Sequence, residues 1–155
     1  MITPQTPELR FLADIAVAVG EPIEIGETLG GRRRIIPILG GRVEGPELNG
    51  AVLPAGADYQ VLRSESVTEL QAEYAIETDE GERVAISNFG IRSGSPEDIA
   101  ALVRGERVDP GRIYFRCTPR MYSAGPRWSY LSSRILLGAG VRTPDEVLLR
   151  VFVVD

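Results

Sequence analysis

The chain has 155 residues and a net charge of −5, and it contains 17 arginines but no lysine and no histidine. The absence of histidine excludes imidazole general bases and histidine-ligated metal sites. The absence of lysine excludes Schiff-base chemistry and the lysine-dependent phosphate loop. The negative charge disfavours nonspecific binding to nucleic acid or acidic membranes. Any proton transfer must therefore use Asp, Glu or Tyr, with Arg as a fixed positive charge.

The cysteine content and the apolar segments further restrict the cross-links, metal sites and location that we expect for the protein. Cys117 is the only cysteine, so neither an internal disulfide nor a cysteine-only metal cluster can form. The N-terminus lacks the pattern of a signal peptide, and no apolar run reaches the roughly 18 residues that span a bilayer. We therefore expect a soluble, cytoplasmic protein without a bound cofactor or transition metal, with residues 1–155 forming a single domain.

Short alternating segments separated by glycine and proline follow one another along the chain, as is typical of an all-β protein. In the first segment, residues 9–19, the side chains of Phe11, Ile15 and Val17 share one side. We expect further strands at residues 33–39, 41–44, 48–53, 59–63, 70–78, 83–88, 113–117, 133–139 and 147–154. The turn sequence Asp79-Glu80-Gly81 should fold the strand that holds Tyr74 back onto the strand that holds Ile86.

Only one helix is expected among these strands. Ser95 is a suitable N-cap, Pro96 suits the first helical position, and the apolar residues Ile99 and Leu102 give a short buried face before Gly105. About ten short strands leave exposed edges unless the sheet closes, because an open edge invites aggregation. We therefore predict a single closed or nearly closed antiparallel β-barrel with one short helix, whose interior either fills with side chains or encloses one small ligand.

Asp58 is the first candidate for a functional site. It follows the small-residue turn Pro54-Ala55-Gly56-Ala57 and leads directly into a strand, a position from which a carboxylate could project into a barrel mouth. The alternative is an Asp that hydrogen-bonds to the backbone of its own turn, and both possibilities stay open.

Strand alternation supplies further candidates, and Asn88, Gly90 and Arg92 form a cluster at the end of a predicted strand. Tyr74 shares a face with Leu70 and Ile76, which predicts an interior hydroxyl, although a packed core tyrosine is the alternative. Arg116 shares a face with Tyr114, so one face combines a guanidinium with an aromatic ring. The predicted catalytic residues are Asp58, Tyr74 and Arg116, and the predicted substrate-binding residues are Arg33, Gln60, Asn88, Arg92 and Trp128. Trp128 lies in a loop flanked by proline and glycine that could cover an opening, but the favoured alternative is a hydrophobic plug.

Several motifs along the chain resemble a known family. They are Gly-Gly-Arg-Arg-Arg-Ile-Ile-Pro-Ile from Gly30, the block Gly56-Ala57-Asp58, and the later segments Asn88-Phe89-Gly90 and Tyr114-Phe115-Arg116. With these motifs the chain resembles, over residues 9–153, a family of small, mainly bacterial single-domain proteins described only as a domain of unknown function. The resemblance implies an antiparallel β-barrel of the small-molecule-binding kind. It implies no reaction, cofactor or catalytic residue.

Three functional interpretations follow from these features. The first is a cofactor-free lyase or isomerase that performs proton transfer on a small oxygenated substrate by isomerisation, elimination or cyclisation, with Asp58 as base, Arg33 or Arg116 as oxyanion partner and Tyr74 as hydrogen-bond donor. The second is a noncatalytic carrier or sensor of a small ligand. The third is a structural interaction module.

The last predicted strand, residues 147–154, is apolar on both faces except at Arg150. A barrel interior can bury only alternate residues of this strand, so the other face needs a cover. We therefore expect a homo-oligomer.

Overall fold

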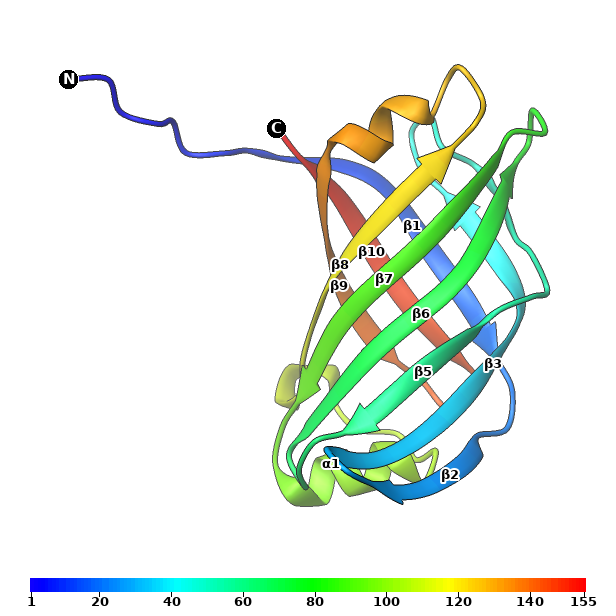
Figure 1. Ribbon diagram of the computed structural model, residues 1–155, viewed down its shortest axis with the longest axis vertical. Coiled ribbons are helices and arrows are strands. Elements are labelled where there is room, and N and C mark those ends of the chain that lie inside the picture. The colour runs from blue at the N-terminus through cyan, green and yellow to red at the C-terminus, as the bar shows by residue number, and fades with distance from the viewer.

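Figure 1 shows the computed structural model, which covers residues 1–155 and consists almost entirely of strands. The strands are β1 (Leu9–Val19), β2 (Ile23–Thr28), β3 (Gly31–Glu44), β4 (Gly50–Val52), β5 (Ala57–Leu62), β6 (Val67–Thr78), β7 (Arg83–Ser93), β8 (Tyr114–Ser123), β9 (Ile135–Arg142) and β10 (Glu146–Val154). The helices are α1 (Pro96–Val103) and two short 3₁₀ turns, η1 (Pro110–Arg112) and η2 (Ser129–Ser133).

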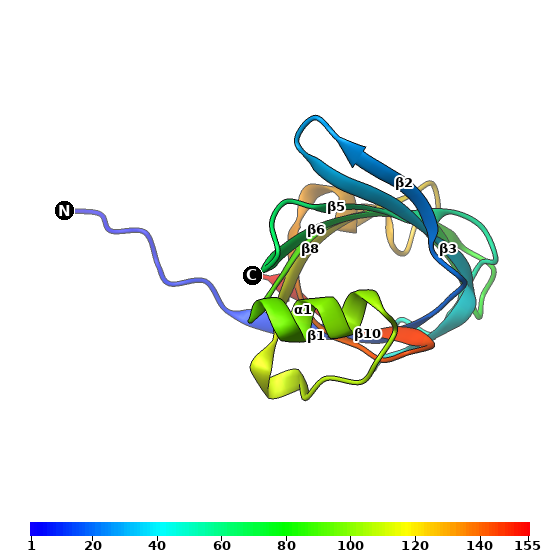
Figure 2. The same cartoon turned by 90° about the horizontal axis from the view of Figure 1, so that it is seen from below.

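Eight of the strands close into an antiparallel ring, which Figure 2 shows from one end. The ring runs β1-β10-β9-β8-β7-β6-β5-β3 and closes where β3 pairs with β1. Strand β4 bridges β3 and β6, while β2 pairs only with β3 and leaves a free edge. The predicted closed barrel with one α-helix is confirmed. None of the helices has the length and apolar character required to cross a membrane.

Strand β3 is one continuous strand rather than the two predicted at residues 33–39 and 41–44. Gly40 and Gly41 bend it without ending it, because both adopt a positive φ, +140° and +146°. A Cβ at Gly41 would lie 1.9 Å from the carbonyl oxygen of Ala16 on β1, so only glycine permits this close approach. The bend lets β3 pair with β5 before it and with β4 after it.

The β2 strand was not predicted, because the alternation of Ile23, Glu24 and Ile25 is short and ends at Gly26, which has φ +109° and lies at a register shift. A bulge in β1 between Phe11 and Ala13 turns Phe11 outward, so it does not share the inner face of Ile15 and Val17 as predicted.

Two other local predictions hold. The turn after β6 places Tyr74 directly opposite Ile86 on β7. The helix α1 begins as expected, because the Ser95 hydroxyl accepts a hydrogen bond from the backbone N–H of Asp98 over 3.1 Å.

The two halves of the barrel interior differ in polarity. The half farther from α1 is a packed apolar core, which includes Leu48, Ile76, Met121, Leu131, Leu136 and Val151. Trp128 belongs to this core with only 2% of its surface exposed, beside η2. The half nearer α1 contains buried polar side chains, notably Arg34, Gln60, Asn88 and Arg92. Any chemistry of the interior therefore belongs to the end that α1 covers.

Candidate functional site

The polar half of the barrel encloses a cavity of about 40 Å³. Its wall combines apolar side chains such as Val17, Ile36, Ile38, Leu70, Phe115 and Leu149 with the polar side chains of Asp58, Gln60, Tyr74, Asn88, Arg92 and Arg142. These residues come from eight strands, because alternate positions of each strand point inward. A volume of this size holds about three water molecules, so the cavity suits only a small molecule or a small part of one.

Strand pairing fixes the depth of each polar group. Asp58 on β5 and Asn88 on β7 both oppose Ala72 on the intervening β6, so they lie at one level, about two strand spacings apart. Tyr74 lies one inward position deeper, toward the apolar core. Arg92 lies two inward positions nearer the α1 end. The polar groups therefore lie at three levels of the barrel. Tyr74 is the deepest, Asp58 and Asn88 are in the middle, and Arg92 is nearest the α1 end.

Asp58 is a largely buried carboxylate that forms no salt bridge. Its Oδ2 accepts a hydrogen bond from Gln60 Nε2 over 2.8 Å, and its Oδ1 accepts one from the backbone N–H of Gln71 over 3.1 Å. Burial raises the pKa of the Asp58 carboxyl, while these hydrogen bonds and the more distant charge of Arg92 partly oppose the rise. The carboxylate therefore faces the cavity in an environment that strengthens it as a base.

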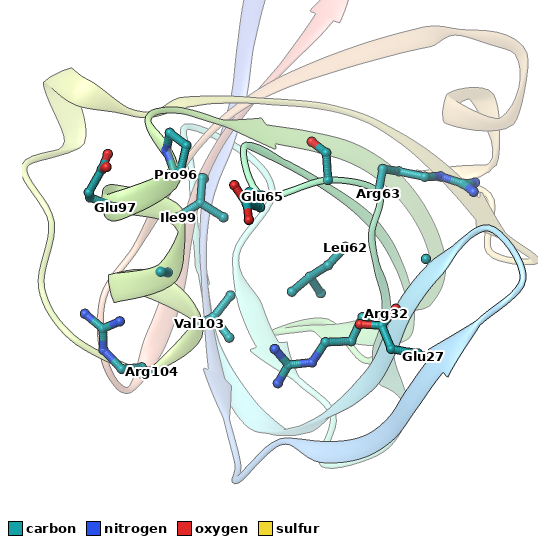
Figure 3. Close-up of a pocket in the computed structure, with 13 residues that line it drawn as sticks. Glu27, Arg32, Leu62, Arg63, Glu65, Pro96, Glu97, Ile99, Val103 and Arg104 are labelled. Carbon is teal, nitrogen blue, oxygen red and sulfur yellow. The ribbon is translucent and has the colours of Figure 1, made fainter.

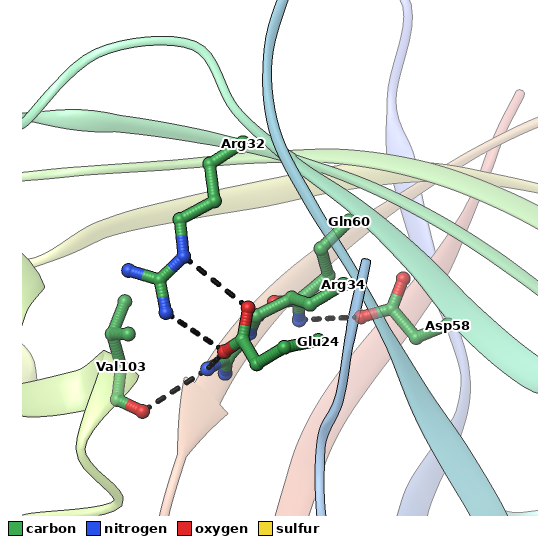
Figure 4. A network of polar contacts seen from close by, with 6 residues as sticks. All are labelled: Glu24, Arg32, Arg34, Asp58, Gln60 and Val103. Carbon is green, nitrogen blue, oxygen red and sulfur yellow. Dashed lines mark hydrogen bonds and ion pairs between the residues drawn. The ribbon is translucent and has the colours of Figure 1, made fainter. Parts of the chain in front are cut away.

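Arg34 connects this carboxylate to the surface through a chain of polar contacts (Figure 4). Arg34 is 3% exposed, and its Nε donates to Gln60 Oε1 over 2.9 Å. Its Nη1 donates to the carbonyl of Val103 at the end of α1 over 3.1 Å and lies 3.7 Å from Glu24. The same guanidinium thus orients Gln60 toward Asp58 and ties α1 to the barrel.

Arg92 has no such partners. It is 3% exposed, forms no hydrogen bond or salt bridge, and leaves Nη1 without any acceptor. Its guanidinium lies over the ring of Phe115, 5.3 Å from the ring centroid. Burial lowers the pKa of Arg92 to about 10, so it remains charged at neutral pH. The interior therefore contains a positive charge without a contacting anion.

Two further groups complete the electrostatics of the cavity. Burial raises the pKa of the Tyr74 hydroxyl, with smaller contributions from Cys117 and Asp58, so Tyr74 is a neutral donor at physiological pH. Burial lowers the pKa of Arg142, which donates only one long hydrogen bond, 3.4 Å, to the carbonyl of Glu146. Tyr74 and Arg142 can therefore both donate to a molecule in the cavity.

The structure brings five of the eight predicted site residues together, namely Asp58, Tyr74, Gln60, Asn88 and Arg92. Three predicted positions need correction. Arg33 and Arg116 are exposed on the outside of the barrel, where Arg33 donates to Thr28 and Arg116 stacks over Tyr114. Trp128 packs into the apolar core at the far end and does not line the cavity.

Sequence reasoning missed Arg34 and Arg142. Arg34 shares its strand face with Ile36 and Ile38, and this alternation predicts that Arg34 rather than Arg33 points inward. Arg142 was missed because the predicted strand ended at Ala139, whereas β9 continues to Arg142. The first error concerned strand phase and the second a strand boundary.

A larger groove of about 830 Å³ lies outside this cavity, between α1 and the β2–β3 hairpin. Figure 3 shows Ile99 and Val103 of α1 on one side, Glu27 and Arg32 of the hairpin on the other, and Leu62 between them. Arg34 contacts Val103 of the groove and Gln60 of the cavity. No group of three or more Cys, Asp or Glu side chains is placed to hold a metal ion.

Comparison with solved structures supports both the fold and the relationship. A crystal structure of a protein of unknown function from Rhodopseudomonas palustris superposes with a TM-score of 0.92 at 42% identity, covering 99% of this chain and all of the other. A β-barrel-like protein from Acinetobacter baumannii has a TM-score of 0.88 at 32% identity, covering 100% of both chains. An enzyme from Penicillium herquei has a TM-score of 0.73 at 13% identity, covering 100% of this chain and 99% of the other, and thus shares the fold alone.

Sequence comparison gives the family. A UPF0311 protein from Rhodopseudomonas palustris is 43% identical over 146 residues, covering 94% of this chain and 95% of its relative. Another from Clostridium acetobutylicum is 40% identical over 139 residues, covering 89% and 88%. The family described as "Protein of unknown function (DUF3237)" matches residues 7–154. The chain therefore belongs to the DUF3237 family, as its resemblance indicated.

Proposed function

We propose that this protein is a cofactor-independent enzyme, an isomerase or lyase, that transfers protons on a small oxygenated substrate in the barrel cavity. The observation that carries the proposal is Asp58, a carboxylate that faces the cavity, forms no salt bridge and has its pKa raised by burial. A general base is most effective when its pKa approaches the operating pH, and burial moves a carboxylate in that direction.

The chemistry uses two groups of the cavity. The Asp58 carboxylate takes a proton from a carbon next to a carbonyl group, so the C–H bond breaks and an O–H bond forms on Asp58. The electron pair of the C–H bond forms a carbon–carbon double bond, and the π electron pair of the carbonyl group moves to its oxygen, which gives an enolate. The Tyr74 hydroxyl, kept neutral by burial, donates a hydrogen bond to this oxygen.

The second half of the reaction determines its outcome. If Asp58 returns its proton to a different carbon, the product is an isomer. If the enolate expels a leaving group from the neighbouring carbon, the reaction is an elimination. The cavity lies inside the barrel, where apolar side chains such as Leu70 and Phe115 form part of its wall, and this setting strengthens the hydrogen bond from Tyr74 to the developing charge. The Penicillium herquei protein with the same fold is described as an enzyme, which is compatible with this proposal.

Hydrogen–deuterium exchange tests the proton transfer without knowledge of the natural substrate. Pyruvate and hydroxyacetone are incubated with the protein in D₂O, and NMR measures the loss of their C–H signals. We expect Asp58→Asn to lower the exchange rate at least about tenfold, which corresponds to roughly 1.4 kcal/mol. The matched control is Asp14→Asn, because Asp14 lies outside the barrel and pairs with Arg150.

Two results would contradict the proposal. Equal exchange by wild type and Asp58→Asn would show that Asp58 is not the base. Failure of the wild type to exchange either compound, together with ligand binding in the cavity, would favour the noncatalytic carrier.

A further inference from the structure

We propose that the substrate of this cavity is a small hydroxy- or enol-bearing carboxylic acid, whose carboxylate pairs with Arg92 and whose hydroxyl donates to Asn88. The inference rests on the proposed function and specifies the class of molecule that the site takes.

The unpaired guanidinium of Arg92 calls for an anion. Burying a charge without a partner costs folding free energy. Buried charges in proteins are therefore usually paired with an opposite charge from the protein or from a bound ligand. Arg92 is 3% exposed, its Nη1 has no acceptor, and its guanidinium lies over the face of Phe115, which cannot accept a strong hydrogen bond. Since Arg92 lines the cavity, a ligand there can reach the free donor.

The charges around the cavity agree with this requirement. Three arginines, Arg34, Arg92 and Arg142, surround a single interior carboxylate, Asp58. Glu24 lies 3.7 Å from Arg34 but also pairs with Arg32 over 2.8 Å, so it compensates the charge of Arg34 only in part. Asp145 stabilises the charge of Arg142, whereas Asp58, which does not contact Arg92, is the only carboxylate that stabilises the charge of Arg92. A carboxylate is the organic anion whose two oxygens match the parallel donors of a guanidinium.

Asn88 supplies the second recognition element. Its Oδ1 is buried and accepts no hydrogen bond from the protein. The hydroxyl group of a ligand could donate this hydrogen bond. Asn88 and Arg92 share the inner face of β7, and their Cα atoms are about 13 Å apart along the strand. Gly90 lies between them on the same strand face and also lines the cavity.

The position of Asp58 completes the arrangement. Asp58 and Asn88 lie at the same level of the barrel, on either side of Ala72. A molecule held by its carboxylate at Arg92 and by its hydroxyl at Asn88 therefore brings the hydroxyl-bearing carbon toward the base. The cavity of about 40 Å³ limits such a molecule to a short chain.

A matched set of small molecules tests this recognition. The probes are glycolate, 3-hydroxypropionate and 4-hydroxybutyrate, the corresponding acids without the hydroxyl, and the primary amides of the three hydroxy acids. Isothermal titration calorimetry measures their dissociation constants. We expect the hydroxy acids to bind and the neutral amides to bind at least about tenfold more weakly. The difference in affinity between a hydroxy acid and the corresponding acid without the hydroxyl should be largest for one of the three chain lengths.

Two variants test which residue binds each end of the ligand. Arg92→Met should weaken hydroxy-acid binding at least about tenfold and raise the melting temperature without ligand, because it removes an uncompensated buried charge. Asn88→Leu should abolish the advantage of the hydroxyl while leaving the binding of the plain acids unchanged. Arg116→Met, which removes an arginine from the outer surface, is the control. It should change neither the affinity for hydroxy acids nor the advantage of the hydroxyl.

The inference fails if the amides bind as well as the acids, if no hydroxy acid binds the wild type, or if Arg92→Met leaves binding unchanged. These outcomes are separable from failure of the proposed function. Asp58→Asn should retain or improve hydroxy-acid binding, since it removes a negative charge, whereas it should lose proton exchange. Binding without exchange in the wild type would leave the acid site in place and remove the catalytic role.

Discussion

Arg34 and Gln60 occupy directly opposed positions on β3 and β5, and Arg34 Nε donates to Gln60 Oε1 over 2.9 Å. A guanidinium has donors only, so this contact fixes which end of the Gln60 amide faces Arg34. The amide nitrogen of Gln60 is consequently directed at Asp58, which must accept. The protonation behaviour of Asp58 therefore depends on an arginine that it does not touch.

This dependence predicts the effect of Gln60→Glu. The new carboxylate keeps an acceptor for Arg34 but offers Asp58 a negative charge in place of an N–H donor. We expect the pKa of Asp58 to rise further above its wild-type value, which carbon-detected NMR titration of the Asp58 carboxyl measures. Gln71→Glu is the control, because the Gln71 side chain points outward to Ser87 and Glu73. An unchanged or lowered pKa in Gln60→Glu would contradict the prediction.

The raised pKa of Asp58 also predicts how stability varies with pH. The folded protein holds the Asp58 proton more tightly than the unfolded chain, in which the carboxyl has its ordinary pKa near 3.8. The contribution of Asp58 to stability is therefore full below pH 3.8 and declines as the pH rises toward its folded pKa.

Asp58→Asn lacks this titration. We expect the unfolding free energy of the wild type, minus that of Asp58→Asn, to be larger at pH 4 than at pH 7, as urea denaturation at each pH measures. Using the difference between the two proteins removes the contributions of all other carboxyls. A difference that is constant with pH, or larger at pH 7, would show that the Asp58 pKa is not raised.

Gly90 provides a test of the cavity itself. A Cβ at this position would lie 3.2 Å from Cys117 Cβ and 3.3 Å from Leu70 Cδ1, a tight fit that small movements can relieve. Gly90→Ala should therefore fold but narrow the space between Asn88 and Arg92. We expect hydroxy-acid affinity to fall roughly tenfold, equivalent to about 1.4 kcal/mol.

Gly140→Ala is the contrasting variant, because its Cβ would lie 2.7 Å from the Phe115 ring. Overpacking of this kind should cost about 1–3 kcal/mol of stability. Calorimetric melting of both variants distinguishes the two effects. A larger loss of stability in Gly90→Ala than in Gly140→Ala would argue that Gly90 is a packing requirement rather than part of a binding space.

The outer face of the barrel predicts self-association. Phe11, Phe152 and Leu137 form a row across β1, β10 and β9, and the two phenylalanine rings pack edge to face with centroids 6.2 Å apart. Leu137 is 42% exposed and the neighbouring Ile135 is 67% exposed. An apolar row of this kind is typical of an interface, and we predict that a second copy of the chain covers it.

Light scattering at micromolar concentration should then give at least twice the mass of one chain. Leu137→Arg should reduce the mass to that of a monomer by placing a charge in the interface. Ile25→Arg, on the exposed β2 strand, should leave the assembly intact. A monomeric wild type would exclude this interface.

Strand alternation was sufficient to predict the barrel and much of the cavity wall. On β6 the alternation of Leu70, Tyr74 and Ile76 gave the inward face correctly, because every second residue there is apolar. Asn88 and Arg92 were selected from a cluster at the end of a predicted strand, and β7 carries both inward.

The same reasoning failed where composition did not fix the phase of a strand. Arg33 and Arg34 are chemically identical, and only the positions of Ile36 and Ile38 show which one is inside. Arg116 was chosen for its neighbour Tyr114, yet both lie outside because Phe115 turns inward. The network from Arg34 to Asp58 could not be predicted, because it joins two strands whose register the sequence does not state.

The two terminal strands, β1 and β10, meet at the end of the barrel farthest from α1, where Glu8 and Asp155 exchange two backbone hydrogen bonds of 3.0 and 2.8 Å (Figure 1). Because these two residues are already neighbours, a short peptide could join them, and new termini could be opened at the exposed Asp79–Gly81 turn. Such a circular permutant would keep the strand order around the barrel. A chain tethered to a surface through residue 1 or residue 155 would likewise present its α1 end, with the cavity, to the solution.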